Sequence, residues 1–413
     1  MNTFLPSNIL IPQVDSMEKW AVIACDQFSS QPEYWEKVRE EVKNAPSALN
    51  LILPEVYLGT KQEKEHIAKI RKTMDGYLKN NIFHTYQQAY VYVERTLGSG
   101  MIRRGLIGAI DLENYSYTMG DDAKIRATEK TVMERIPPRM NIRYNASIEL
   151  PHVILLCDDS EQILMNVISE KKNQLPKLYD FELMENGGHI TGWLVEGTEM
   201  KEFNQRLEQY EQKIKEKYQD ITNSPMVFAV GDGNHSLATA KACYEKLKRT
   251  YPAKDFTNHP ARYALVELEN IHDPSQNFEP IHRIITGVEG KELLKQLKET
   301  CCREEGFPIK WYVGKEEDEV FLKLEKNQLA VEKLQTFLDD YLKETGGEID
   351  YIHGDDVLKK LAAKKNSIGF LLPATEKEDL FPSVMANGVL PRKTFSMGHA
   401  NEKRYYIEGR VIK

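Results

Sequence analysis

Apolar positions recur along this chain with two different periods, which together predict a mixture of strands and helices. Residues 86–96 alternate apolar and polar side chains, and after a glycine turn residues 104–112 suit the partner strand, which predicts an antiparallel hairpin. Residues 181–183 and 190–195 flank a Gly-Gly pair and predict a second hairpin. Further strands are predicted by short apolar runs at 20–25, 151–157, 263–268, 311–313 and 367–372.

Helical spacing of apolar residues marks the segments between these strands. Pro32 fits the first turn of a helix, and Ile67, Ile70 and Met74 form one apolar stripe. Beside the helix that begins at Pro32, the predicted helices cover residues 54–81, 161–175, 200–218, 289–300, 317–324 and 328–344. The fold class predicted from this order is α/β (α+β), with mixed sheets and helices.

One stretch, residues 225–244 (PMVFAVGDGNHSLATAKACY), organises the chain. Its five apolar residues 226–230 suit a buried strand, and residues 231–234 (GDGN) then allow a tight turn. Apolar side chains follow at helical spacing at Leu237, Ala240, Tyr244 and Leu247. The stretch therefore predicts a strand, a glycine turn and a helix.

Polar residues gather where this predicted helix begins: Asp232, Asn234, His235 and Ser236. A helix N-terminus presents unpaired N–H groups and partial positive charge, which suit a phosphate. Asp232 has the wrong sign to touch a phosphate, so in this interpretation it binds a cation such as Mg²⁺. The alternative is that these residues only cap the helix.

Several segments in order resemble the uncharacterised prokaryotic family catalogued as domain of unknown function 1015. They are ACDQFSSQPEYW, RRGLIGAIDLENY, RATEKTV, GDGNHSLATA, FEPIHRII, DYIHGDD and LPRKTFSMGHANEKRYYIEGRVI, which together span nearly the whole chain. The central motif is also similar to that of ParB-like and sulfiredoxin-like nucleotide-binding folds, including free-serine kinases. These resemblances imply a central ParB/sulfiredoxin-like nucleotide-binding region with accessory lobes.

The resemblance also implies roles for individual residues. Asp232, His235 and Glu129 would be catalytic, with Asp232 the ligand of Mg²⁺ and Glu129 the base that accepts a hydroxyl proton. The chain departs from the family pattern where Thr128 replaces a His. In the central motif, Asn234 replaces a His and Ser236 replaces an Arg, which removes a fixed positive charge.

Further residues are candidates for binding the phosphates of ATP or ADP. In the central turn they are Gly231, Gly233, Asn234 and Ser236. Elsewhere they are His282 and Arg283, then Lys393 and Thr394, with Arg104 as a weaker candidate. The alternatives are a structural His-Arg pair and a solvated basic loop. Asp26 and Ser29, at the end of a predicted strand, form a second possible wall of the site.

Length and charge bound the remaining possibilities. With 413 residues the chain exceeds one core, and we expect lobes at 1–150, 151–287, 288–350 and 351–413. The net charge of −8 argues against non-specific nucleic-acid binding, and the absence of a long apolar run argues against a membrane partner. Five cysteines without metal-ligand spacing, and no leader pattern, predict a cytoplasmic protein.

The function predicted from these features is a nucleotide-binding phosphotransferase that acts on a small hydroxylated metabolite. Two alternatives stay open: a non-catalytic ligand-binding sensor and a metal-dependent phosphoester hydrolase. The sequence leaves the oligomeric state undetermined.

Overall fold

The computed structural model describes residues 2–118 and 120–413, and the chain forms two compact units. The large unit comprises Met1–Ala127, Thr131–Gln276 and Gly398–Lys413. The small unit comprises Thr128–Lys130 and Asn277–Met397. The chain thus leaves the large unit after Gln276 and returns to it for its last segment. The finer division into four lobes stays a prediction.

A mixed sheet of 11 strands forms the centre of the large unit, in the order β10-β11-β4-β5-β13-β9-β12-β7-β6, with β1 beside β5 and β2 beside β4. Both predicted hairpins are confirmed as antiparallel pairs of this sheet. The first half consists of β1(Phe4–Leu5), β2(Ser7–Pro12), β4(Phe83–Thr96), β5(Ile102–Asp111), β10(Lys177–Leu183) and β11(Gly188–Val195).

The other half of the sheet carries the central motif. It consists of β13(Tyr263–Asn270), β9(Ile154–Cys157), β12(Phe228–Asp232), β7(Ile125–Ala127) and β6(Tyr115–Ser116). Strand β12 runs antiparallel to β9 and parallel to β7, so it lies inside the sheet rather than at its edge. Phe228, Ala229 and Val230 are completely buried there, which explains the continuous apolar run in the sequence.

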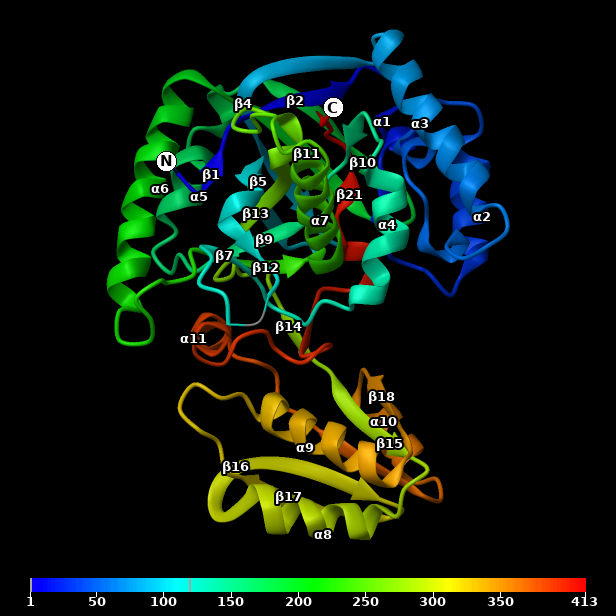
Figure 1. Ribbon diagram of the computed structural model, residues 1–413, viewed down its shortest axis with the longest axis vertical. Helices are drawn as coiled ribbons and strands as arrows, with labels where there is room; N and C mark the ends of the chain where they lie inside the picture. The colour runs from blue at the N-terminus through cyan, green and yellow to red at the C-terminus, as the bar shows by residue number, and fades with distance from the viewer. Residues whose placement is uncertain (1, 119) are drawn as a thin grey trace. The chain divides into compact units, whose positions relative to one another are not determined.

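Helices cover the sheet on both sides. They are α1(Met17–Trp20), α2(Pro32–Val42), α3(Glu63–Lys79), α4(Ile136–Arg143), α5(Ile163–Ser169), α6(Gly197–Lys217) and α7(Asn234–Thr250). Figure 1 shows α5 and α6 at one side of the large unit, with α2 and α3 at the opposite side. Across residues 2–118 and 120–413, none of the helices has the length and apolar character needed to cross a membrane.

The last segment of the chain is built into the large unit by two short strand pairs. Strand β21(Tyr405–Tyr406) pairs with β3(Val22–Ile23), and β22(Arg410–Val411) pairs with β8(Ile148–Glu149). The buried indole of Trp20 donates a hydrogen bond of 3.0 Å to the carbonyl of Ile407. Residues far apart in sequence are therefore brought to one core.

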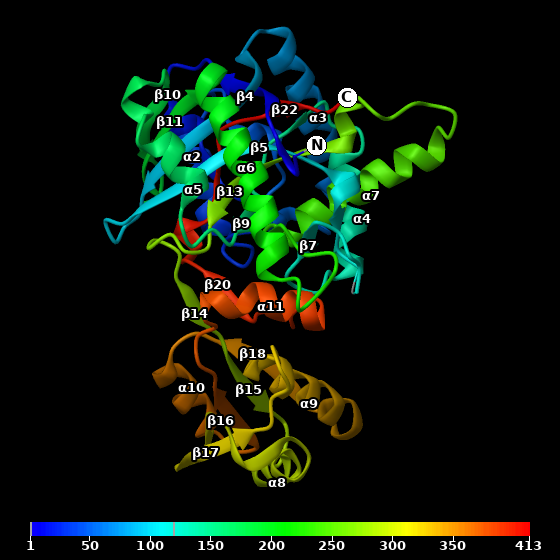
Figure 2. The same cartoon turned by 90° about the vertical axis from the view of Figure 1, so that its left-hand side faces the viewer.

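The small unit has its own five-stranded sheet, in the order β17-β16-β19-β15-β18. Figure 2 shows α8 and α9 on one face of this sheet and α10 on the other. The strands are β15(His282–Thr286), β16(Cys302–Val313), β17(Glu316–Leu322), β18(Glu348–Ile352) and β19(Ser367–Leu371). The helices are α8(Gly290–Cys301), α9(Ala330–Thr345), α10(Asp355–Ala362) and α11(Lys377–Asn387), and a second small sheet pairs β14(Phe278–Pro280) with β20(Phe395–Met397).

The helix predicted over residues 317–324 is wrong, because this segment forms strand β17(Glu316–Leu322). Its Glu-rich sequence suits a helix, but Val320 and Leu322 are buried while Phe321 between them is exposed. Burial of every second residue is the strand pattern. Pairing with the neighbouring strand β16 therefore overrides the local helix propensity.

Candidate functional site

The turn between β12 and α7 requires glycine at position 233. Gly233 has a φ of 77°, a left-handed conformation that side chains with a Cβ rarely adopt. A Cβ at this position would also lie 3.0 Å from the Cα of Val153. The predicted strand, turn and helix are thus present, and α7 begins at Asn234 directly after Gly233.

Asp232 lies at the end of β12 with its carboxylate held from two sides. Its Oδ1 accepts a hydrogen bond of 2.8 Å from the N–H of Gly233, and its Oδ2 lies 3.2 Å from the Nζ of Lys403. Burial alone would raise the pKa of Asp232, but the positive charge of Lys403 and the neighbouring His152 lower it below its usual value. Asp232 is therefore ionised at neutral pH, with 24% of its side chain exposed.

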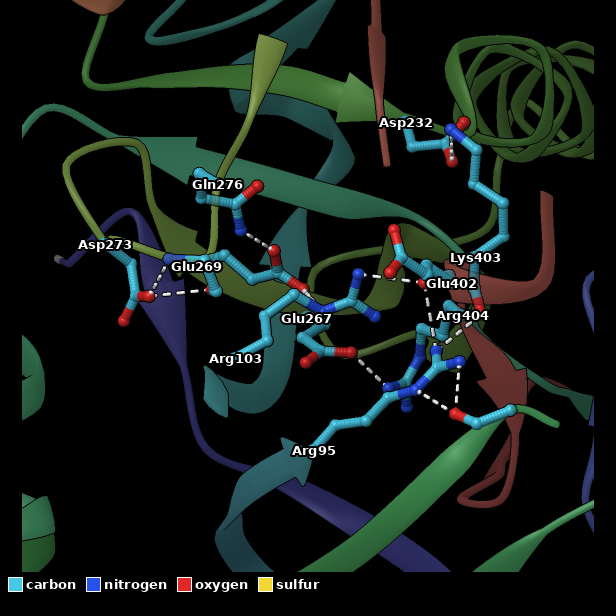
Figure 3. Close-up of polar contacts among 12 residues, drawn as sticks. Arg95, Arg103, Asp232, Glu267, Glu269, Asp273, Gln276, Glu402, Lys403 and Arg404 are labelled. Carbon is cyan, nitrogen blue, oxygen red and sulfur yellow. Dashed lines mark hydrogen bonds and ion pairs between the residues drawn. The ribbon is translucent and has the colours of Figure 1, made fainter. Parts of the chain in front are cut away.

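Two buried arginines fix the backbone that carries Lys403 (Figure 3). The guanidinium of Arg95 donates hydrogen bonds to the carbonyls of Glu402 at 3.0 Å and Lys403 at 2.7 Å. Arg103 donates another, of 2.9 Å, to the carbonyl of Glu402. These hydrogen bonds hold the Lys403 ammonium group beside the start of α7. In this helix Ser236 replaces a positively charged Arg of the family pattern.

The imidazole of His235 is neutral and accepts a hydrogen bond from the backbone. Its Nε2 accepts a hydrogen bond of 3.1 Å from the N–H of Val132. Burial, reinforced by Arg139 and Arg135, lowers the pKa of His235 to about 4. A neutral ring with an occupied Nε2 supports the segment at Val132, and the catalytic role expected for His235 stays a prediction.

Ser236 takes part in a chain of hydrogen bonds between residues that are far apart in the sequence. Its Oγ lies 2.7 Å from Nε2 of His152, and Nδ1 of that ring lies 2.6 Å from the hydroxyl of Tyr406. The Tyr406 hydroxyl also donates to the Sγ of Cys25, at 3.2 Å. We call this set, Ser236, His152, Tyr406 and Cys25, the polar relay.

The relay and Asp232 lie next to each other in the large unit. The Cδ2 atom of His152 is 3.4 Å from the place of a Cβ on Gly233, the residue that follows Asp232. No local sequence motif marks His152 or Lys403 as a site residue. His152 lies near the start of an apolar run that predicts a strand, and Lys403 is one of several basic residues near the C-terminus.

A buried network of charged side chains centred on Arg404 holds the segment that carries Lys403 (Figure 3). The Arg404 guanidinium bonds both the Glu267 and Glu408 carboxylates, and its Nε donates a hydrogen bond of 3.1 Å to the carbonyl of Pro151. Pro151 precedes His152, and Arg404 follows Lys403. One side chain therefore links the two parts of the chain that supply the site.

Five predicted site residues belong to the small unit. Arg283 is completely buried, and its guanidinium donates to Gln335 at 2.7 Å and to the carbonyl of Lys393 at 3.0 Å. His282 accepts a hydrogen bond of 3.2 Å from the N–H of Leu372 and lies 3.2 Å from Asp355. These contacts are internal to the small unit and support its sheet.

The other small-unit residues lie together. The carboxylate of Glu129 accepts a hydrogen bond of 3.1 Å from the N–H of Lys393, and the Thr394 hydroxyl donates one of 2.6 Å to the carbonyl of Pro391. The segment at Glu129 and the segment at Lys393 are thereby connected within the small unit. Their roles as base and phosphate ligands stay predictions.

The remaining candidates have partners of their own. Arg104 forms a hydrogen bond of 3.3 Å with Asp273, and Asp26 accepts one of 3.1 Å from the side chain of Gln27. Within residues 2–118 and 120–413, no three or more His, Cys, Asp or Glu side chains are grouped to hold a metal ion. Asp232 alone still fits Mg²⁺, because this ion is commonly held by one or two carboxylates together with substrate phosphates.

Comparison with known families matches residues 9–385 to the family described as "Protein of unknown function (DUF1015)". The chain belongs to this family. The match covers most of the sequence and confirms the resemblance found in the ordered motifs. No curated protein matches the chain.

Several solved structures are similar to the chain at low sequence identity. A free serine kinase in complex with AMP is 13% identical, over 71% of this chain and 92% of that chain, with a TM-score of 0.36. SbnI with C-terminal truncation from Staphylococcus aureus is 11% identical, over 68% and 82%, with a TM-score of 0.35. A conserved hypothetical protein from Pyrococcus furiosus is 13% identical, over 71% and 91%, with a TM-score of 0.33. Similarity at this level identifies no ligand, so the proposal below rests on residues of this chain.

Proposed function

We propose that the large unit is a phosphotransferase that binds ATP or ADP at the start of α7 and transfers a phosphoryl group to a small hydroxylated metabolite. The observation that carries the proposal is the pairing of Asp232 with Lys403 beside the first turn of α7. This places a carboxylate suited to a cation and an ammonium suited to a phosphate at one helix N-terminus.

Asp232 and Lys403 would bind groups of opposite charge. Asp232, ionised at neutral pH, would hold Mg²⁺, which neutralises charge on the transferred group when bound. Lys403 would release the carboxylate and bind the phosphate oxygens, assisted by the partial positive charge at the N-terminus of α7. Arg95 would act as a positioning residue, since it holds the Lys403 backbone.

Nucleotide binding is tested by thermal shift, with ADP and ATP titrated in the presence and absence of Mg²⁺. We expect a rise in melting temperature for the wild type that is lost in Asp232→Asn and Lys403→Met, because a ligand of the folded state stabilises it by mass action. Glu161→Gln is the control, since its ion pair with Lys213 is exposed on the surface. A shift absent from the wild type would overturn the proposal.

Phosphoryl transfer is then followed by ³¹P NMR with a panel of hydroxylated metabolites. Formation of a phosphate ester supports the proposed reaction. Release of inorganic phosphate without an acceptor would favour the phosphoester hydrolase instead. Binding without turnover would favour the ligand sensor, and Glu129→Gln would show whether turnover depends on the carboxylate predicted as the base.

A further inference from the structure

The large unit contains a partly open cavity of about 150 Å³ beside α7. Aliphatic side chains from distant parts of the chain form most of its wall, among them Leu53, Ile142, Leu237, Ala240 and Leu265. A cavity of this size with such a wall accommodates an apolar group of about six non-hydrogen atoms, comparable to benzene. Asp232 and Lys403, the two residues that carry the proposed phosphate site, do not line this cavity.

One end of the cavity is polar, and it is formed by the polar relay. Cys25, His152, Ser236 and Tyr406 all line the cavity. The hydroxyl of Tyr406 accepts a hydrogen bond of 3.2 Å from the backbone N–H of Cys25, which leaves it one proton to donate and one further lone pair. The Tyr406 hydroxyl donates that proton to the Sγ of Cys25, so the remaining lone pair faces Nδ1 of His152.

The Cys25 end of the polar relay is uncharged. Burial and the nearby Asp26 raise the pKa of the Cys25 thiol to about 12, so the thiol stays protonated. Because Tyr406 donates to Cys25, Nδ1 of His152 faces a lone pair of the Tyr406 oxygen and Nε2 faces the Ser236 hydroxyl. A ligand hydroxyl can join this chain at Ser236 and Nε2 of His152.

The charged residues on the cavity wall are paired with each other. Arg139 forms an ion pair with Glu55, and Arg143 forms one with Glu149. An ionic ligand would have to leave water without an opposite charge free to receive it, which is costly in an apolar site. The wall therefore favours a neutral ligand.

We propose that this cavity binds a small uncharged alcohol whose apolar body, of about six non-hydrogen atoms, fills the aliphatic space and whose hydroxyl joins the polar relay at Ser236 and His152. Its identification as the phosphoryl acceptor rests on the proposed function. The hydroxyl end lies beside the start of α7, because the His152 ring approaches Gly233.

The transfer balances with these groups alone. The alcohol oxygen forms a bond to the terminal phosphorus of the nucleotide, and the bond from that phosphorus to its bridging oxygen breaks. Nε2 of His152, in place of the Glu129 carboxylate expected from the sequence, takes the hydroxyl proton, and the products are a phosphate monoester and a nucleotide shortened by one phosphate.

The binding test uses isothermal titration of the full chain with 3-methylbutan-1-ol, its methyl ether, 3-methylbutanoate and 3-methylbutylamine. We expect the alcohol to bind at least tenfold more tightly than the ether, because a site that hydrogen-bonds a hydroxyl rejects an analogue without it. The carboxylate and the amine should bind more weakly than the alcohol. Equal binding of alcohol and ether, tighter binding of a charged analogue, or no binding of the alcohol would overturn the proposal.

Two variants locate the site. Ala240→Leu fills the cavity and should abolish alcohol binding while leaving the nucleotide-induced thermal shift in place. His152→Phe keeps a ring but removes the hydrogen bonds, and should reduce the preference for alcohol over ether toward one. If Ala240→Leu does not fold, the alcohol-to-ether preference of His152→Phe still tests whether the ligand hydroxyl binds at His152.

The nucleotide titration separates this inference from the proposed function. Nucleotide binding without alcohol binding overturns the inference alone. Alcohol binding without nucleotide binding supports the cavity as a ligand site and overturns the phosphotransferase.

Discussion

Gly233 combines a left-handed backbone with close contact to a neighbouring strand, and both features are required to start α7 directly after β12. Ala at this position has to adopt a φ of 77° and bring its Cβ to 3.0 Å from Val153. The first effect alone costs about 1–3 kcal/mol. The proposed phosphate site therefore depends on the backbone conformation of a residue that has no side chain.

Gly233→Ala is accordingly expected to lower the free energy of unfolding by about 1–3 kcal/mol or more. Urea denaturation followed by circular dichroism measures the change. Gly100→Ala is the matched control, because Gly100 has a φ of 81° but nothing within 4 Å of an added Cβ. If both substitutions have the same effect, the close approach to Val153 does not contribute.

Lys403 determines the titration of Asp232, and the sign of its effect on stability follows from the lowered pKa. A carboxylate whose folded pKa is lowered contributes stability above its unfolded pKa and loses it as the pH falls through the folded value. Lys403→Met is thus expected to raise the Asp232 pKa and to destabilise more at pH 7 than at pH 3. Carboxyl ¹³C NMR titration and urea midpoints at the two pH values measure both effects; an unchanged Asp232 pKa would contradict the assignment.

At the scale of elements, strand β13 carries a buried acid into the middle of the sheet. Glu269 is completely buried, accepts a hydrogen bond from Gln276, and lies 3.3 Å from Arg103. Burial raises its pKa to about 7 against the opposing charge of Arg103, with a further contribution from Glu267. This strand therefore binds a proton in the folded state at mildly acidic pH.

Because Glu269 binds this proton in the folded state, the free energy of unfolding should depend on pH. A carboxyl group with a raised folded pKa contributes stability that is complete below its unfolded pKa and is lost as the pH rises through about 7. Glu269→Gln keeps the shape without the ionisation, so relative to the wild type it should gain about 2–3 kcal/mol between pH 5 and pH 8. Urea denaturation at several pH values measures this difference, and parallel pH profiles for the two proteins would refute it.

At the scale of the whole molecule, the large unit is assembled from three separate parts of the chain. The last part, Gly398–Lys413, returns after the small unit and supplies Lys403, Arg404 and Tyr406. Arg404 is bonded to Glu267 and Glu408 in the interior, where all three side chains are at most 5% exposed. The site is complete only when this last part is in place.

Arg404→Met should therefore be strongly destabilising, by about 3–5 kcal/mol, because it leaves two buried carboxylates without their partner. It should also weaken nucleotide binding, since the variant no longer fixes the segment that holds Lys403. Lys213→Met, which breaks an exposed pair with Glu161, is the control and should change stability by less than about 1 kcal/mol. Similar losses in the two variants would contradict the structural role of Arg404.

The sequence by itself determined the elements whose signal is local. The alternation in residues 86–96 and the apolar segment after the glycine turn specified the first hairpin, and the apolar run before Gly231 and Gly233 specified the strand and turn that start α7. These predictions succeed because side-chain period and glycine conformation act over a few residues. The ordered motifs also identified the family.

Tertiary structure decided what depends on residues distant in sequence. Strand β17 forms against its helical pattern because it pairs with β16, and Lys403 reaches Asp232 because Arg95 and Arg103 hold its backbone. The polar relay joins Cys25, His152, Ser236 and Tyr406, which no spacing rule connects. Local sequence determines an element where its own side-chain period or a glycine decides it, but strand pairing and contacts between distant residues are set by packing and by the need to satisfy buried polar groups.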